Sequence, residues 1–124
     1  MVVKILFSSD VVETSLPMIR LTKSRNGKTG TATFLFIRPS IFEMDNFSNL
    51  SIDGMFLVYE KKTIVSYDIE IFFHEGKPFL LKTIVLLKSP KEWFLFLNFM
   101  SAYAKETGLS FDEIPEAKNL KNEN

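Results

Sequence analysis

The chain has 124 residues, carries 15 basic and 15 acidic side chains and contains no cysteine. This length suits one domain with its own hydrophobic core, zero net charge argues against a general polyanion binder, and the lack of cysteine excludes disulfides and thiolate metal sites. No apolar run approaches the roughly 20 residues of a membrane span, and because the N-terminal residues lack the pattern of a signal peptide, we expect no secretory leader.

The first half of the sequence predicts three strands joined by polar connections. Residues 2–7 (VVKILF) form a short apolar run, and the polar connection over residues 8–17 ends in a proline. Residues 18–24 (MIRLTKS) alternate between two faces, as a strand does. Residues 31–38 (TATFLFIR) are apolar on both faces, which predicts that both faces are covered or that one of them contacts a partner.

A basic segment with a turn signal separates the last two of these strands. Its central pair, Asn26-Gly27, favours a tight turn with positive φ. No acidic residue lies between positions 13 and 43, and the basic residues that we select as a candidate electrostatic contact are Arg20, Lys23, Arg25 and Lys28. Composition leaves three interpretations open: a solvated hairpin tip, a contact for a protein or another anionic partner, or an RNA-binding hairpin beside exposed aromatic residues.

The letters Gly-Lys-Thr at positions 27–29 imitate the end of a phosphate-binding loop, but two features exclude that interpretation. The motif requires a glycine five residues earlier, at position 22, where this chain has threonine. It also requires a helix after the loop, whose N-terminus holds the phosphate, whereas a β-rich run follows here. We therefore expect no nucleotide site in this segment.

The second half of the sequence predicts three further strands. An irregular connection over residues 39–53, with a helical turn at 40–44, leads to strands at 54–60, 63–73 and 79–88. Because the turns between these three strands are short, they predict an antiparallel meander.

A long helix near the C-terminus is marked by signals at both ends. Ser89 is placed as the N-cap with Glu92 completing a capping box, and Gly108 favours a left-handed C-cap. The apolar stripe predicted to pack on the sheet consists of Trp93, Phe96, Leu97, Met100, Tyr103 and Ala104. Phe94, Leu95 and Phe99 lie partly off this stripe.

These elements predict an α+β fold, in which one antiparallel β-sheet of about five to six strands packs against a C-terminal α-helix. We expect a single domain over residues 1–111. Residues 112–124 are polar and predict a disordered tail.

Residues that could carry chemistry are sparse. His74 is the one histidine and lies at a turn beside Glu75, which is typical of a polar turn rather than a metal site. Asp68 and Glu70 are two apart in a predicted strand, and a solvent-facing strand edge explains them without catalysis. No nucleophile elbow surrounds any serine. We expect no catalytic residue, no metal, no cofactor and no small-molecule substrate.

Three segments together resemble a known family. They are IRLTKSRNGKTGTATFLFIRP (19–39), IDGMFLV (52–58) and SPKEWFLFLNFMSAYAKETGLSF (89–111). In this order they resemble the small soluble photosystem II assembly proteins, which have been described as photosystem II reaction centre W or as the thirteen-kilodalton photosystem II protein. Phe94 and Leu95 depart from the family pattern, in which polar residues follow the tryptophan.

The resemblance implies a non-enzymatic assembly factor. Such a protein would attach transiently to incomplete photosystem II at the thylakoid periphery, on the cytoplasmic side in a cyanobacterium or the stromal side in a plastid. Its implied partners are core antenna and reaction-centre subunits, with no nucleic acid, and its sheet would accept an extended segment from the core antenna subunit by strand addition. A basic-hairpin RNA-binding module is the alternative.

For this implied contact we select the basic residues named above and one strand. Residues 31–38 are the strand that we expect to accept the partner segment. One face of that strand carries Thr31, Thr33, Leu35 and Ile37.

Overall fold

The computed structural model describes residues 2–8, 11–43 and 52–109, which form two four-stranded antiparallel sheets and one long helix. Sheet 1 has the strand order β2-β1-β5-β6, with β1 at Val3–Ser8, β2 at Val11–Val12, β5 at Met55–Tyr59 and β6 at Lys62–Ser66. Sheet 2 has the order β3-β4-β8-β7, with β3 at Met18–Lys23, β4 at Gly30–Ile37, β8 at Lys77–Leu87 and β7 at Ile69–His74. A short 3-10 helix, η1, covers Ser40–Glu43, and α1 covers Pro90–Thr107.

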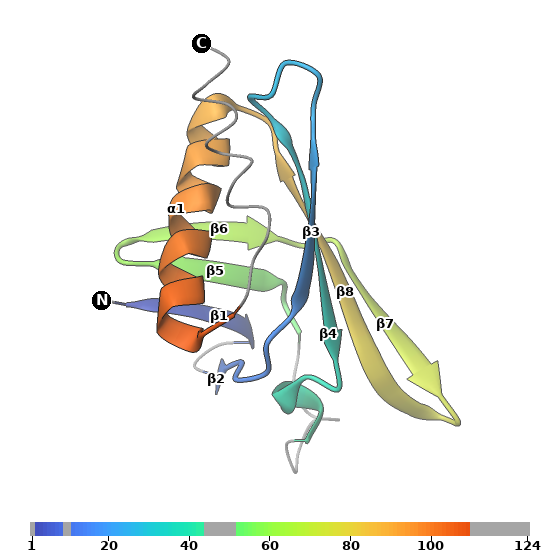
Figure 1. The fold of residues 1–124 in the computed structure, drawn as a ribbon. Coiled ribbons are helices and arrows are strands. Elements are labelled where there is room, and N and C mark those ends of the chain that lie inside the picture. Colours follow the sequence, from blue (N-terminus) through green and yellow to red (C-terminus); the bar gives the residue numbers. More distant parts are fainter. Residues whose placement is uncertain (1, 9–10, 44–51, 110–124) are drawn as a thin grey trace.

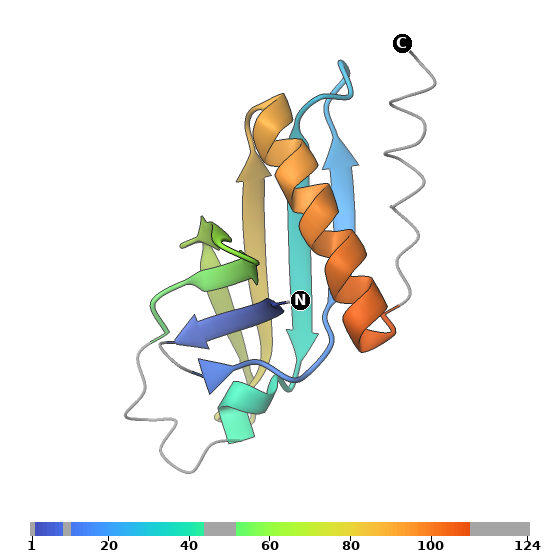
Figure 2. The same cartoon turned by 90° about the vertical axis from the view of Figure 1, so that its left-hand side faces the viewer.

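The predicted α+β class, with antiparallel strands and a C-terminal helix packed on them, is confirmed, and the described residues form two four-stranded sheets where one sheet of about five to six strands was predicted. Sheet 1 and α1 lie side by side on the same face of sheet 2, and the strands of sheet 1 run crosswise to those of sheet 2 (Figures 1 and 2). The sequence indicated neither the division into two sheets nor the two-residue strand β2, which falls in the segment predicted as a connection.

The predicted meander fails at residues 63–73, which form two strands in two different sheets. The chain leaves sheet 1 after Ser66 and enters sheet 2 at Ile69. At the crossing, the Ser66 hydroxyl donates to the backbone oxygen of Ile84, and the Ile84 N–H donates to the backbone oxygen of Asp68 at 3.2 Å. These bonds join the connection to β8, so the chain can change sheets without leaving these backbone groups unpaired.

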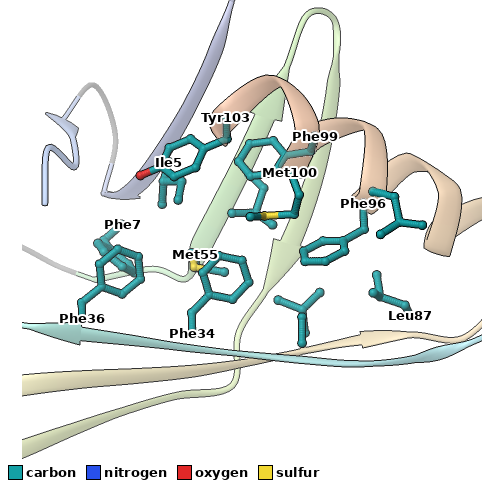
Figure 3. Close-up of a cluster of buried hydrophobic side chains, with 14 of the residues drawn as sticks. Ile5, Phe7, Phe34, Phe36, Met55, Leu87, Phe96, Phe99, Met100 and Tyr103 are labelled. Carbon is teal, nitrogen blue, oxygen red and sulfur yellow. The ribbon is translucent and has the colours of Figure 1, made fainter. Parts of the chain in front are cut away.

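Aromatic rings fill the space between sheet 2, sheet 1 and α1 (Figure 3). Phe7 of β1 packs edge-on against Phe36 of β4, with ring centroids 5.0 Å apart, and Phe34 packs edge-on against Phe96 of α1 at 6.1 Å. Phe99, which the helical pattern placed partly off the packing stripe, is fully buried and stacks on Tyr103 at 5.5 Å. Sheet 1 and sheet 2 both pack against α1, so the buried face of the helix is wider than packing on a single sheet would require.

The predicted ends of the helix are confirmed. The Ser89 side chain accepts from the Glu92 N–H at 3.1 Å, and Glu92 in turn accepts from the Lys88 N–H at 2.9 Å. Gly108 adopts φ 78° and donates its N–H to the Ala104 oxygen. The predicted helical turn at 40–44 is η1, whereas the predicted tail over 112–124 lies outside the described residues.

Candidate partner-binding surface

The basic segment forms the hairpin between β3 and β4, as its turn signal predicted. Gly27 has φ 70° and donates its N–H to the Ser24 oxygen at 3.0 Å. The Asn26 side chain accepts from the Ser24 hydroxyl at 2.6 Å and from the Lys28 N–H at 2.9 Å. These short-range bonds hold the backbone of the tip in one shape, so the points from which the Arg25 and Lys28 side chains extend are defined.

The structure does not bring the four selected cations together. Arg25 and Lys28 lie exposed at the hairpin tip, whereas Arg20 lies farther down β3. Arg20 alternates with the half-buried Ile19 and Leu21, which pack against the core, so its side chain lies on the opposite face of sheet 2. Lys23 is half-buried at the end of β3. The candidate contact is therefore a tip with two cations and a separate cation on the sheet.

The prediction that residues 31–38 accept a strand is wrong for β4. This strand pairs with β8 over its full length and with β3 from Gly30 to Leu35, so its backbone has no free edge over those six residues. The four residues selected on it do share one face, opposite the buried Ala32, Phe34 and Phe36. Those four are Thr31, Thr33, Leu35 and Ile37, of which Ile37 is exposed and the others are half-buried.

Strand β3 is the end strand best suited to strand addition. The strands at the ends of the two sheets are β2, β6, β3 and β7. β2 has only two residues, β7 carries a register shift at Phe72/Phe73, and β6 is joined to sheet 2 through Ser66. Short strands and bulges make an edge a poor template. β3 has six residues in unbroken register with β4 and leads directly into the basic tip.

The RNA-binding alternative required exposed aromatic residues beside the hairpin, and the structure contradicts that requirement. Phe34 and Phe36, which follow the basic segment, are both fully buried and cannot stack on bases. On the helix, the side chain of Phe94 is 49% exposed, so this aromatic residue does lie at the surface, but on a different element.

Other candidate groups remain dispersed. His74 lies 4.0 Å from Glu75 in an exposed turn and packs edge-on against Phe79. Asp68 belongs to the connection before β7, not to a strand shared with Glu70. Among the described residues, no three His, Asp or Glu side chains are grouped as metal ligands. Within the same residues, no helix is long and apolar enough to cross a membrane.

A buried carboxylate is the main feature that the sequence reasoning missed. Glu13 is 4% exposed and accepts from four donors on Ser15, Ser40 and Ile41. It therefore fixes the segment that enters β3. Burial also raises the pKa of Tyr103 to about 12, with a smaller contribution from the charge of Glu13.

Comparison with known proteins identifies the family of this chain. A family model described as Psb28 protein matches residues 5–111. The chain belongs to the Psb28 family. The resemblance seen in the three sequence segments is thereby confirmed, and the match spans the hairpin, β3 and the whole of α1.

Curated members of the Psb28 family match over most of their length, and each is called "Photosystem II reaction center Psb28 protein". The protein from Rippkaea orientalis is 43% identical over 110 residues, covering 89% of this chain and 95% of its own. The protein from Trieres chinensis is 40% identical over 108 residues, covering 87% and 94%. The protein from Nostoc sp. is 40% identical over 110 residues, covering 89% and 97%.

Proposed function

We propose that this protein is a non-enzymatic assembly factor that binds transiently to photosystem II intermediates and aids their biogenesis or repair. The observation that carries the proposal is membership of the Psb28 family, whose curated members are named for photosystem II. The protein works at the periphery of the thylakoid membrane, on its cytoplasmic or stromal side. Its partners are core antenna and reaction-centre subunits.

The contact is made by the edge of β3 and the basic hairpin tip. An extended segment of the partner pairs with β3, where backbone hydrogen bonds supply affinity and alternating side chains set the register. Arg25 and Lys28 lie just beyond the end of that edge, so they attract acidic residues of the same segment or of its surroundings. Arg20 contributes from the sheet itself.

Charge reversal at the tip tests this contact. The variant Arg25→Glu/Lys28→Glu should reduce co-purification with core antenna and reaction-centre subunits from solubilised thylakoids, and the reduction should be greatest at low salt. Lys61→Glu/Lys62→Glu is the matched control, because it makes the same change of charge at the exposed tip of the β5–β6 hairpin. Equal loss in both variants, or loss in neither, would contradict a role for the basic tip.

The pull-down also tests the assignment to incomplete complexes. Core subunits should come down without the extrinsic proteins of mature photosystem II. Recovery of mature complexes alone, or of no photosystem II subunit, would overturn the proposed function.

A further inference from the structure

The outer face of sheet 2, which points away from sheet 1 and α1, carries large exposed apolar side chains at positions where a solvated face is normally polar. In Figure 1, sheet 1 and α1 lie on one side of sheet 2, and no described element lies on the other. Met18, Ile37 and Leu86 are 59%, 60% and 56% exposed. An antiparallel sheet with one solvated face normally alternates apolar inward and polar outward residues, so this departure requires an explanation.

The pairing registers fix which side chains are neighbours on the outer face. Strand by strand from β3 to β7, the outward positions form four rows: Thr22, Thr31 and Leu86; Arg20, Thr33 and Ile84; Met18, Leu35, Lys82 and Glu70; and Ile37, Leu80 and Phe72. Aliphatic or aromatic side chains occur in every row. The ionisable residues of these rows are Arg20 on the end strand β3, Lys82 on the inner strand β8 and Glu70 on the end strand β7.

The surface is hollowed on both sides of Leu86. A hollow of about 330 Å³ lies between this side chain and the β3–β4 hairpin, with Thr22 and Thr31 in its lining. A second hollow of about 300 Å³ lies between Leu86 and the connection at Tyr67. Lys88 lines both hollows. Leu86 therefore stands as an apolar projection with room beside it for side chains of a partner.

We propose that the outer face of sheet 2 docks an amphipathic helix of a partner protein, with carboxylates on the margins of its apolar stripe. An element lying on this face cannot pair with the backbone of β4 or β8, because the hydrogen bonds of a sheet run between neighbouring strands in its plane, where β4 pairs with β3 and β8 and β8 pairs with β4 and β7. It must satisfy its own backbone groups, as a helix does. Carboxylates complement Arg20 and Lys82, which outnumber Glu70 on this face.

The dimensions of the face set the length of the helix. From Leu80 to Leu86, the outward positions of β8 span about 20 Å at 3.4 Å per residue. A helix covers that distance in about 13 residues. A helix is about 10 Å wide and neighbouring strands lie about 4.8 Å apart, so a helix lying along β4 places its two margins near Arg20 on β3 and Lys82 on β8.

Two other occupants fit the face less well. A lipid surface favours cations around the rim of an apolar patch, whereas the end strands of this face carry one cation, Arg20 on β3, and one carboxylate, Glu70 on β7, and Lys82 lies between them. A second copy of this chain, packed by two-fold symmetry, would bring a face with one net positive charge against its own equivalent. A partner helix with acidic margins neither requires a rim of cations nor brings like charges together.

A pair of stapled 14-residue helical peptides tests the inference with the full chain. Both carry the same leucine stripe; one has glutamates at the margins and the other has lysines. The acidic peptide should bind at least ten-fold more tightly, as measured by fluorescence anisotropy. The variant Arg20→Glu/Lys82→Glu should reverse this preference. Chemical shifts of the labelled protein should move on β4 and β8.

Exposed apolar residues supply the second arm of the test. Leu86→Ser and Ile37→Ser should each weaken binding of the acidic peptide by about ten-fold, whereas Phe94→Ser, an equally exposed residue on α1, should not change it. Both substituted residues are more than half exposed, and if one variant loses its folded circular dichroism spectrum, the other still tests the face.

Three results would overturn the inference. They are equal binding of the two peptides, binding to vesicles of anionic lipid that Leu86→Ser abolishes, and self-association that the same substitution abolishes. The peptide assay contains no photosystem II, so its outcome is independent of the proposed function. Loss of the pull-down through Arg25→Glu/Lys28→Glu, with peptide binding retained, would separate the two surfaces.

Discussion

Replacing Glu13 should destabilise the fold strongly, because this buried carboxylate joins two segments that are far apart in the sequence. It accepts from the Ser40 N–H at 2.6 Å, the Ser40 hydroxyl at 2.8 Å, the Ser15 N–H at 2.9 Å and the Ile41 N–H at 3.1 Å. One side chain thus holds the chain entering β3 against the start of η1. The sequence separation between these two segments is large, so no local bond can replace it.

The size of the effect follows from the donors that would lose their acceptor. A buried donor left without a partner costs about 1–3 kcal/mol, and hydrogen bonds to a charged group lie at the upper end. Some of the four donors are only partly buried and would be rehydrated. Removing the buried charge also removes the desolvation penalty that the carboxylate carries in the folded state. We therefore expect Glu13→Ala to lower the free energy of unfolding by about 3 kcal/mol. Glu13→Gln retains one acceptor oxygen and should cost about half as much.

Urea unfolding monitored by the fluorescence of Trp93, the single tryptophan, measures this loss. With a denaturant slope of about 1.5 kcal/mol per molar urea, Glu13→Ala should lower the midpoint by about 2 M. Glu106→Gln, at an exposed position on α1, should leave the midpoint unchanged. A loss below about 1 kcal/mol for Glu13→Ala, or equal losses for both Glu13 variants, would refute the reasoning.

Three further changes test other parts of the structure. Gly30→Ala would place a methyl group 2.6 Å from the Thr22 backbone oxygen and 2.7 Å from the Trp93 ring. The substitution should lower the free energy of unfolding by about 1–3 kcal/mol and shift the fluorescence emission of Trp93. Unchanged emission would contradict this close packing. Ser89→Ala removes the N-cap and should lower the melting temperature by about 4 °C, corresponding to about 1 kcal/mol. The pKa of Tyr103 is raised to about 12 from 10.0, so between these pH values the folded state retains a proton that the unfolded state releases. Stability should fall in that window by up to about 1.4 kcal/mol per pH unit, and an equal fall in Tyr103→Phe would exclude this origin.

Several features could be predicted from the sequence because short-range interactions determine them. The Asn26-Gly27 turn is stabilised by bonds within six residues, and the ends of α1 by Ser89, Glu92 and Gly108 acting on neighbouring backbone groups. The alternation of β4 likewise indicated that Phe34 and Phe36 share a face. Steric and hydrogen-bonding preferences of this kind act before the chain has any tertiary structure.

The candidate surface was predicted only in part. The basic tip was found, and so was the face of β4 that carries Thr33 and Leu35. The strand available for addition was not, because whether a strand lies at an edge depends on its neighbours in space. β4 lies between β3 and β8, whereas β3 pairs with β4 alone, and neither arrangement is written in the residues of the strand itself.

The sequence by itself determined the α+β class, the hairpin with its charge, the limits of the helix and, through three short segments, the family. Tertiary structure decided which residues became neighbours. The passage from sheet 1 to sheet 2 after Ser66 follows from its bonds to β8, and the burial of Glu13 follows from donors far along the chain. A carboxylate in a polar connection carries no local sign that distant backbone groups will surround it. The physical reason is that burial and strand neighbours are properties of long-range contacts, whereas turns and caps are properties of a few adjacent residues.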